Sequence, residues 1–160
     1  MSGAAKLDGF LLAELVRGGA ENLSTNAETV NDLNVFPIPD GDTGDNMLLT
    51  MQGGVRAAGA GEADLAAVSR RIAQGMLLGA HGNSGVILSQ FCEGLAAGFG
   101  GKVSADADAI KAALRSGVKY AYAAVVEPTE GTILTVMRDA AEYACARGSE
   151  TPGELLDDFI

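Results

Sequence analysis

The chain has 160 residues, of which 48% are apolar and only 5% aromatic, and it has no tryptophan. This length and composition predict one packed globular domain over residues 1–160 and exclude a disordered chain. The formal net charge of −10 argues against a nucleic-acid-binding surface, because contact with many backbone phosphates needs clustered Lys and Arg.

The cysteines and the apolar runs indicate where such a protein would reside. Cys92 and Cys145 each fall in an apolar helical pattern, which predicts buried thiols in a reducing compartment and not a disulfide. The N-terminus lacks a signal-peptide pattern, and no apolar run approaches the length of a membrane span. We therefore expect a cytoplasmic protein without stable membrane insertion.

Apolar residues recur at helical spacing along most of the chain. Leu7, Leu11 and Leu15 predict a first helix that either ends near Gly18-Gly19 or continues, kinked, to about Val30. Later helices are predicted over 43–58, 65–76, 86–99, 110–125 and 133–147, and the pattern of a helix start occupies 151–160. No segment alternates long enough to predict a strand. The expected fold is all-α, an antiparallel bundle of six or seven helices.

The acidic turn, residues 34–46 (Asn-Val-Phe-Pro-Ile-Pro-Asp-Gly-Asp-Thr-Gly-Asp-Asn), separates the first two helical patterns. Two prolines stiffen its approach, and the helix expected from about Thr43 presents free N–H groups and the positive end of its dipole. Hard oxygen ligands beside such a helix start indicate a Mg²⁺–phosphate site. An ordinary turn with a helix cap is the alternative. The oxygen-bearing side chains are Asn34, Asp40, Asp42, Thr43, Asp45 and Asn46.

The glycine turn, Gly79-Ala-His-Gly-Asn-Ser-Gly85, precedes the helix predicted from Val86. Its backbone N–H groups and Ser84 would suit a helix-start anion cradle, and a simple cap by Asn83 or Ser84 is the alternative. His81 is the only histidine, and it is as compatible with a solvated or capping role as with catalysis. No Walker P-loop occurs anywhere in the chain.

The third turn, Glu127-Pro-Thr-Glu-Gly-Thr132, precedes the helix predicted from Ile133. By themselves its threonines resemble helix caps, and Glu127 and Glu130 are expected to be solvated. Alternate turns of an antiparallel bundle lie at the same end, so we expect the three turns to converge there.

Three segments, taken in this order, resemble the L-type nucleotide-binding domain of the dihydroxyacetone kinase family over about 20–147. The acidic turn resembles the family's Asn-Val-Phe-Pro-Val-Pro-Asp-Gly-Asp-Thr-Gly, residues 79–90 resemble Gly-Ala-Arg-Gly-Asn-Ser-Gly-Val-Ile-Leu-Ser-Gln, and 130–136 resemble Glu-Gly-Thr-Ile-Leu-Thr-Val. The Phe-Pro-Ile-Pro approach is most similar to the kinase component of bacterial fatty acid kinase.

This resemblance implies an antiparallel α-helical barrel that binds ATP and two Mg²⁺ ions at one end. Asp40 and Asp42 would be the catalytic residues, as metal ligands that bridge to the nucleotide phosphates, and Asn34 would be a weaker candidate metal ligand. The remaining nucleotide contacts implied are Thr43, Gly44, Asn46, Gly82, Asn83, Ser84, Gly85 and Thr132.

The implied reaction transfers the γ-phosphoryl group of ATP to the carboxylate of a fatty acid, which a separate fatty-acid-carrying binding protein would present. A carboxylate is already ionised at neutral pH, so no strong general base is needed. The alternatives are a dihydroxyacetone kinase L subunit and a non-catalytic nucleotide-binding helical module. Formation of a homodimer is left open.

Three departures from the family pattern carry expectations of their own. His81 stands where the family has Arg, so a compensating positive charge or weaker nucleotide binding is expected. Asp45 stands where a small polar residue is common, and it would either join the metal site or repel phosphate. The family domain continues with further helices, so we expect a chain truncated at its C-terminus, with apolar surface left uncovered.

Overall fold

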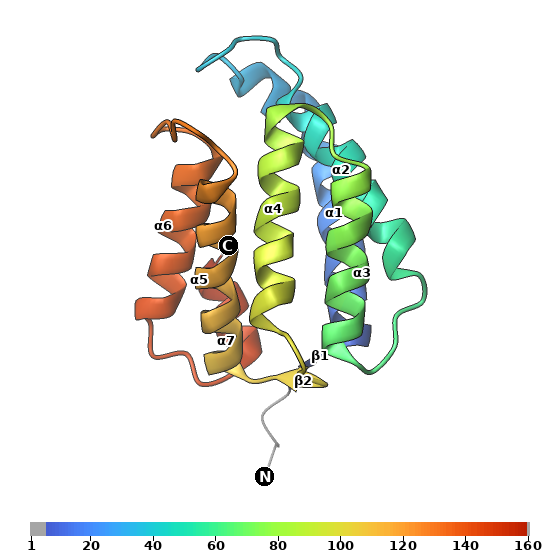
Figure 1. The fold of residues 1–160 in the computed structure, drawn as a ribbon. Helices are drawn as coiled ribbons and strands as arrows, with labels where there is room; N and C mark the ends of the chain where they lie inside the picture. Colours follow the sequence, from blue (N-terminus) through green and yellow to red (C-terminus); the bar gives the residue numbers. More distant parts are fainter. Residues whose placement is uncertain (1–5, 160) are drawn as a thin grey trace.

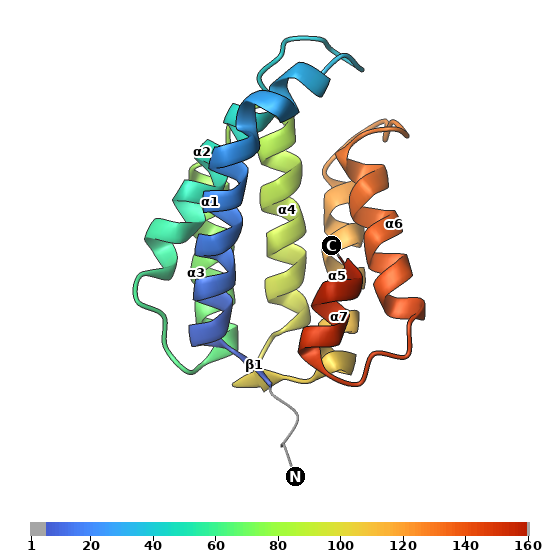
Figure 2. The same ribbon diagram turned by 180° about the vertical axis from the view of Figure 1, so that it is seen from behind.

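Seven helices dominate the part of the chain that the computed structural model describes, residues 6–159 (Figure 1). The expectation of an all-α antiparallel bundle is confirmed, since each helix from α1 to α6 reverses the direction of the one before it (Figures 1 and 2). Expectations for the N-terminal segment 1–5 and for residue 160 lie outside the described residues. The helices are α1 (Gly9–Leu33), α2 (Thr43–Ala58), α3 (Leu65–Leu78), α4 (Gly82–Gly98), α5 (Ala107–Ala123), α6 (Ile133–Ala146) and α7 (Pro152–Phe159).

The first helix is continuous through the glycine pair. Gly18 and Gly19 lie inside α1, so the first helix does not end at them and runs on to Leu33. The helix starts at a side-chain cap, where Asp8 Oδ1 accepts a hydrogen bond of 2.9 Å from the Leu11 amide. Its buried positions are small residues, including Ala13, Ala20 and Ala27, and these let the neighbouring helices approach closely.

A short strand pair joins the start of the chain to its middle. β1 (Leu7–Asp8) pairs antiparallel with β2 (Ser104–Ala105), with Leu7 opposite Ala105. The expectation that the chain has no strand is wrong at this place. Two residues are too few for a period-two alternation to show in the sequence, so the pattern could not reveal the pair.

Glycines bring neighbouring helices into close contact. A Cβ at Gly53 of α2 would collide with the carbonyl oxygen of Gly75 in α3, and one at Gly94 of α4 would lie 2.6 Å from the Cα of Gly117 in α5. Such contacts leave no room for a side chain, because the interaxial distance depends on what stands between the helices. The abundance of glycine in the sequence is thus used at helix crossings as well as in turns.

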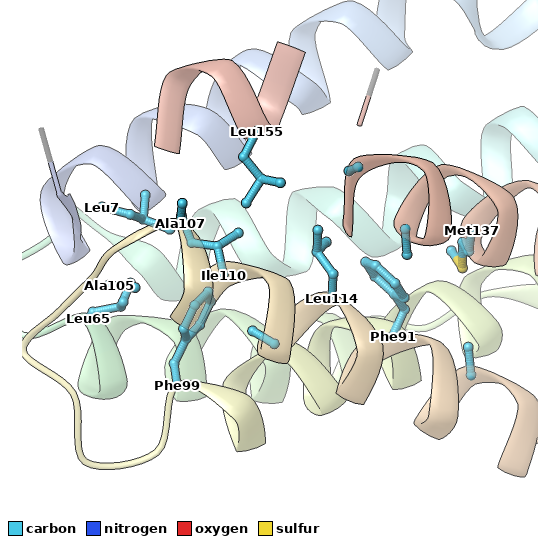
Figure 3. Close-up of a cluster of buried hydrophobic side chains, with 14 of the residues drawn as sticks. Leu7, Leu65, Phe91, Phe99, Ala105, Ala107, Ile110, Leu114, Met137 and Leu155 are labelled. Carbon is cyan, nitrogen blue, oxygen red and sulfur yellow. The ribbon is translucent and has the colours of Figure 1, made fainter. Parts of the chain in front are cut away.

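The core consists of two clusters that share partners from α1 and α4. The larger cluster lies mainly between α4, α5, α6 and α7, where Phe91, Ile110, Leu114, Leu134 and Leu155 are buried (Figure 3). The smaller one joins α1, α2 and α3 through Ala13, Ala58, Val68, Ile72 and Met76. Leu12, Leu88 and Cys92 pack against both clusters.

Both cysteines are free thiols, as expected from the sequence. Burial raises the pKa of the Cys92 thiol to about 12, so this side chain is a neutral packing group in the core. Across residues 6–159, no helix is both long enough and apolar enough to cross a membrane.

The three polar turns lie at one end of the bundle, and the strand pair and α7 lie at the other. Both views place the acidic turn, the glycine turn and the third turn at the upper end (Figures 1 and 2). This arrangement follows from the alternation of helix direction, because each of these turns comes after a helix that runs upward.

Candidate nucleotide and metal site

The acidic turn is closed by the side chain of Asn34. Its Nδ2 donates to the Ile38 carbonyl oxygen at 2.9 Å, and its Oδ1 accepts from the Thr43 hydroxyl at 2.9 Å. The amide thus ties the beginning of the turn to its middle and to the first residue of α2. Two predicted site residues, Asn34 and Thr43, therefore hold each other, and the exposed Asp40 lies within the segment that they close.

Asp42 occupies the N-cap position of α2 without capping it. The side chain of an N-cap Asp ordinarily accepts from the second and third amides of its helix. Here those amides, Gly44 N and Asp45 N, donate to Asn31 Oδ1 of α1 at 2.8 and 3.3 Å. Because α1 supplies the cap, the Asp42 carboxylate, two residues after Asp40 in the sequence, is left available to a ligand.

The helix after the glycine turn begins earlier than the sequence pattern indicates. α4 starts at Gly82, and its first intrahelical bond runs from Gly85 N to His81 O at 3.0 Å. Asn83 and Ser84 lie in the first turn, so the prediction that one of them is the cap is wrong. The amides of residues 82–84 precede that first bond and point out of the helix start, as an anion cradle requires.

The acidic turn and the glycine turn are in direct contact. Gly82 has φ +59° and lies against the Asn46 side chain, where a Cβ would collide with the amide group. Below it, the buried Thr50 hydroxyl donates to Asn46 O at 2.7 Å and accepts from the His81 amide at 3.2 Å. The start of α4 therefore stands beside the first turns of α2, which brings Asn46 to Gly82 and Gly85. The other two predicted contacts on α2 face elsewhere, since Gly44 packs against Ala27 of α1 and the Thr43 hydroxyl is bonded to Asn34.

His81 has a defined contact within its own turn. Its Nδ1 lies 2.7 Å from the Gly79 carbonyl oxygen, and a carbonyl can only accept, so Nδ1 carries the hydrogen. In the neutral ring the lone pair is then on Nε2. The imidazole is exposed, and it does not cap α4.

The third turn ends in a side-chain cap, as its threonines suggested. Thr132 is the N-cap of α6, where its hydroxyl accepts from Leu134 N at 3.3 Å and donates to Thr129 O at 2.8 Å. Its neighbour Glu130 is not merely solvated, since Thr135 and Arg138 of α6 and Tyr122 of α5 all donate to its carboxylate. The hydrogen bonds of this turn to other elements are with α5 and α6. Among residues 6–159 none joins it to the other two turns, with which it shares an end of the bundle.

The partners of Glu130 and the cap residue Asn31 were missed by sequence reasoning. Glu130 and Arg138 are separated by a turn and more than one turn of helix, so they fit no simple intrahelical pairing rule. Asn31 stands at the end of an ordinary helical pattern, and only the packing of α1 on α2 brings it to Gly44.

The oxygen-bearing side chains of the acidic turn suit a Mg²⁺ ion that is also bound by nucleotide phosphates. They do not suit a metal ion held by protein side chains alone. Within residues 6–159, no group of three or more His, Cys, Asp and Glu side chains is placed to hold a metal ion. The predicted ligands are two carboxylates, Asp40 and Asp42, with the amide of Asn34. Mg²⁺ commonly takes one or two carboxylates and completes its shell with water and substrate phosphate oxygens, which matches this set.

Comparison with known proteins agrees with the three segments. The DAK2 domain profile matches residues 37–159. The chain is 50% identical over 139 residues to protein YloV of Bacillus subtilis, a match that covers 86% of this chain and 25% of YloV. It is 41% identical over 159 residues to an uncharacterized protein of Staphylococcus aureus, covering 98% of this chain and 29% of that protein.

A third relative, an uncharacterized protein of Staphylococcus saprophyticus, is 44% identical over 148 residues, with 92% of this chain and 27% of that protein covered. The chain thus spans little more than a quarter of the length of these curated relatives. The profile covers most of the chain, and its match includes the acidic turn from Pro37 together with both later turns. The chain belongs to the DAK2 domain family and carries a kinase-related nucleotide-binding domain of that family.

Proposed function

We propose that this domain binds ATP with Mg²⁺ and transfers the γ-phosphoryl group to the carboxylate of a protein-bound fatty acid, giving an acyl phosphate. The proposal rests on the carboxylate of Asp42, which accepts no hydrogen bond from its own helix. The residue stands at a helix start, yet Asn31 takes its capping bonds at 2.8 and 3.3 Å. A carboxylate kept out of its ordinary hydrogen bonds, next to Asp40, is suited to ligate a metal.

The residues of the two contacting turns have separate roles in this proposal. Asp40 and Asp42, with Asn34 as a further candidate, would hold Mg²⁺, which neutralises charge on the phosphates when bound. The amides at the start of α4 and the Ser84 hydroxyl would orient the phosphate oxygens. Asn46 stands between the two groups against Gly82, while Thr43 and Gly44 would meet the phosphates through the start of α2. Thr132 would contact the nucleotide from the third turn.

The acceptor and its carrier are proposed from the chemistry and from the surface beside the acidic turn. A fatty acid carboxylate is ionised at neutral pH, so the site needs positioning and charge neutralisation more than a general base. The apolar side chains next to Asp40 are exposed, Val35 by 73% and Phe36 and Ile38 by 57% each. Exposed apolar side chains in one segment are typical of a contact surface, which supports presentation of the acyl chain by a carrier protein.

Calorimetric titration of the purified chain with ATP, with and without Mg²⁺, tests the nucleotide site. We expect binding that requires Mg²⁺ and that the double variant Asp40→Ala/Asp42→Ala loses. Asp32→Ala, which removes an exposed carboxylate from the last turn of α1, serves as the matched control and is expected to bind as the wild type does. Absence of binding by a folded wild-type chain would refute the proposal.

Transfer from radiolabelled ATP separates the possible acceptors. Label is expected in a fatty acid loaded on its carrier protein and not in dihydroxyacetone supplied with its own binding subunit. The opposite result would identify a dihydroxyacetone kinase subunit. Nucleotide binding without transfer to either acceptor would identify a non-catalytic nucleotide-binding module.

A further inference from the structure

Glu130 is the centre of a hydrogen-bond network on the third turn. Its Oε2 accepts from the Thr135 hydroxyl at 2.8 Å, and Arg138 Nη1 lies 2.8 and 2.9 Å from its two carboxylate oxygens. Tyr122 OH donates to Oε1 at 3.3 Å and accepts from Arg138 Nη1 at 3.1 Å. One exposed carboxylate thus connects the third turn to both α5 and α6.

The same network reaches the backbone beside Thr132. The amide of Gly131 donates to Thr135 Oγ1 at 2.8 Å, and this hydroxyl is the one that donates to Glu130. Gly131 has φ +79°, a conformation that glycine adopts as readily as others, so a hydrogen bond is needed to hold its backbone in one of them. Thr135 therefore fixes the residue that precedes Thr132 as well as the carboxylate of Glu130.

Arg138 forms ion pairs with two carboxylates, those of Glu130 and Asp139. Besides Glu130, its Nε and Nη2 each lie 2.9 Å from Asp139 Oδ1. An exposed ion pair contributes little to stability, whereas a guanidinium fork that engages two carboxylates restricts geometry strongly. The arrangement is thus better suited to fixing the conformation of the third turn than to stabilising the fold. The positive charge of Arg138 is already neutralised by Glu130 and Asp139.

We propose that Glu130 and Arg138 form a positioning pair that holds the third turn, and with it Thr132, in the conformation that receives the nucleotide. This inference rests on the proposed function, because it concerns the same ATP site. The pair acts through the turn, and Arg138 itself does not contact phosphate. Within residues 6–159 no hydrogen bond joins this turn to the acidic turn or to the glycine turn, so its bonds to α5 and α6 have to set its position.

Two variants distinguish positioning from direct phosphate binding. If Arg138 bound phosphate, Glu130→Gln would free the guanidinium and tighten Mg²⁺-dependent ATP binding. Positioning predicts the reverse: Glu130→Gln and Arg138→Met each raise the Kd of ATP about tenfold, the scale of one charge-assisted hydrogen bond. Because the two residues act as a unit, the double variant is expected to lose little more than either single variant.

Hydrogen exchange gives a readout that a general loss of stability would not imitate. In both single variants the amides of residues 129–132 are expected to exchange faster, while those of the acidic turn and the glycine turn keep the wild-type rates. Arg138→Lys, which keeps a donor for Glu130, is expected to restore part of the affinity. Arg56→Met, an exposed site in the last turn of α2 at the other end of the bundle, is the control.

The outcomes separate this inference from the proposed function. A folded Arg138→Met chain that binds ATP within about twofold of the wild type, well short of one charge-assisted hydrogen bond, overturns the inference alone. Tighter binding by Glu130→Gln also overturns it. If the wild type fails to bind ATP, the proposed function falls and this inference falls with it. Should Arg138→Met not fold, Thr135→Val retains every charge and is expected to weaken binding in the same direction.

Discussion

The start of α2 is capped by Asn31 of the preceding helix and not by Asp42, the residue at the N-cap position. Asn31 belongs to the preceding helix, yet its oxygen accepts from the two amides that an N-cap side chain would ordinarily serve. Asp42 occupies the cap position with its carboxylate unused. A single side chain in α1 therefore decides whether the carboxylate of Asp42 faces its own helix or a ligand.

Removal of the Asn31 oxygen is expected to weaken nucleotide binding more than it weakens the fold. In Asn31→Ala the Gly44 and Asp45 amides become free, and Asp42 would turn to cap them and leave the metal. Because one cap replaces another, the free energy of unfolding should fall by about 1 kcal/mol or less. Urea unfolding and calorimetric ATP titration measure the two effects. Asn31→Asp, which keeps an acceptor, should retain most of the affinity, and equal affinity of Asn31→Ala and wild type would contradict the role.

Glu130 gives the stability of the domain a pH dependence in the acid range. The Thr135 hydroxyl, and next Arg138, lower the pKa of Glu130 below its ordinary value of 4.5. A lowered folded-state pKa contributes stability above the unfolded-state value, and this contribution is lost as the pH falls through the folded-state value. The thermal midpoint of Glu130→Gln should therefore lie below that of the wild type at neutral pH, and the gap should close below pH 4.5.

The measurement is a series of thermal unfolding curves from neutral pH into the acid range. Glu28→Gln, an exposed position on α1, provides a matched loss of one carboxylate. A gap between Glu130→Gln and wild type that persists unchanged at the lowest pH would show that the charge of Glu130 does not contribute.

At the scale of single elements, glycine has opposite consequences at two helical positions. Gly53 of α2 faces the Gly75 carbonyl oxygen of α3 with no space for a Cβ, whereas nothing lies within 4 Å of the Cβ position at Gly18 of α1. The first is required by the packing of two helices. The second only adds backbone entropy to the unfolded chain.

Matched substitutions should therefore change stability in opposite directions. Gly53→Ala forces α2 and α3 apart and is expected to lower the free energy of unfolding by roughly 1–3 kcal/mol, the usual cost of overpacking. Gly18→Ala should raise it by roughly 0.5–1 kcal/mol, because alanine is the better helix former. Urea unfolding monitored by circular dichroism measures both. A neutral Gly53→Ala variant would show that the helices can separate at no cost.

Helix existence was predictable from the sequence, whereas helix starts were predictable only in part. The apolar period located α2 at Thr43 and α6 at Ile133, where the structure has them. The start of α4 was placed at Val86 and lies at Gly82. Gly82 to Gly85 contains poor helix formers, and the contact with Asn46 and Thr50, which no local pattern contains, stabilises that first turn.

Over the whole molecule, the alternation of helix direction was enough to predict that the three turns share an end. Which turns touch was not predictable, because contact depends on the glycine-mediated packing of α2 on α3 and α4. The acidic turn meets the glycine turn at Asn46 and Gly82. The third turn is instead tied by Glu130 to Tyr122 and Arg138, a connection that joins two different helices and leaves no periodic signal.

The residues that hold the candidate site together also begin before the segment that matches the DAK2 domain family. The DAK2 profile matches from residue 37, while Asn31 and Asn34, which cap α2 and close the acidic turn, come from the end of α1 and the residue after it. A protein cut at the profile boundary would keep both aspartates and lose the groups that orient them.

The pairing of β1 with β2 bears on the order in which the domain folds. Most helix contacts join neighbours along the chain, and such local contacts form quickly because they close short loops. Leu7 reaches Ala105 only across the whole α1–α4 segment, so this junction carries a large loop-closure entropy and should form late. The end of the bundle that holds the strands would then be completed after the end that holds the polar turns, and nascent chains could assemble the two contacting turns before α5 is synthesised.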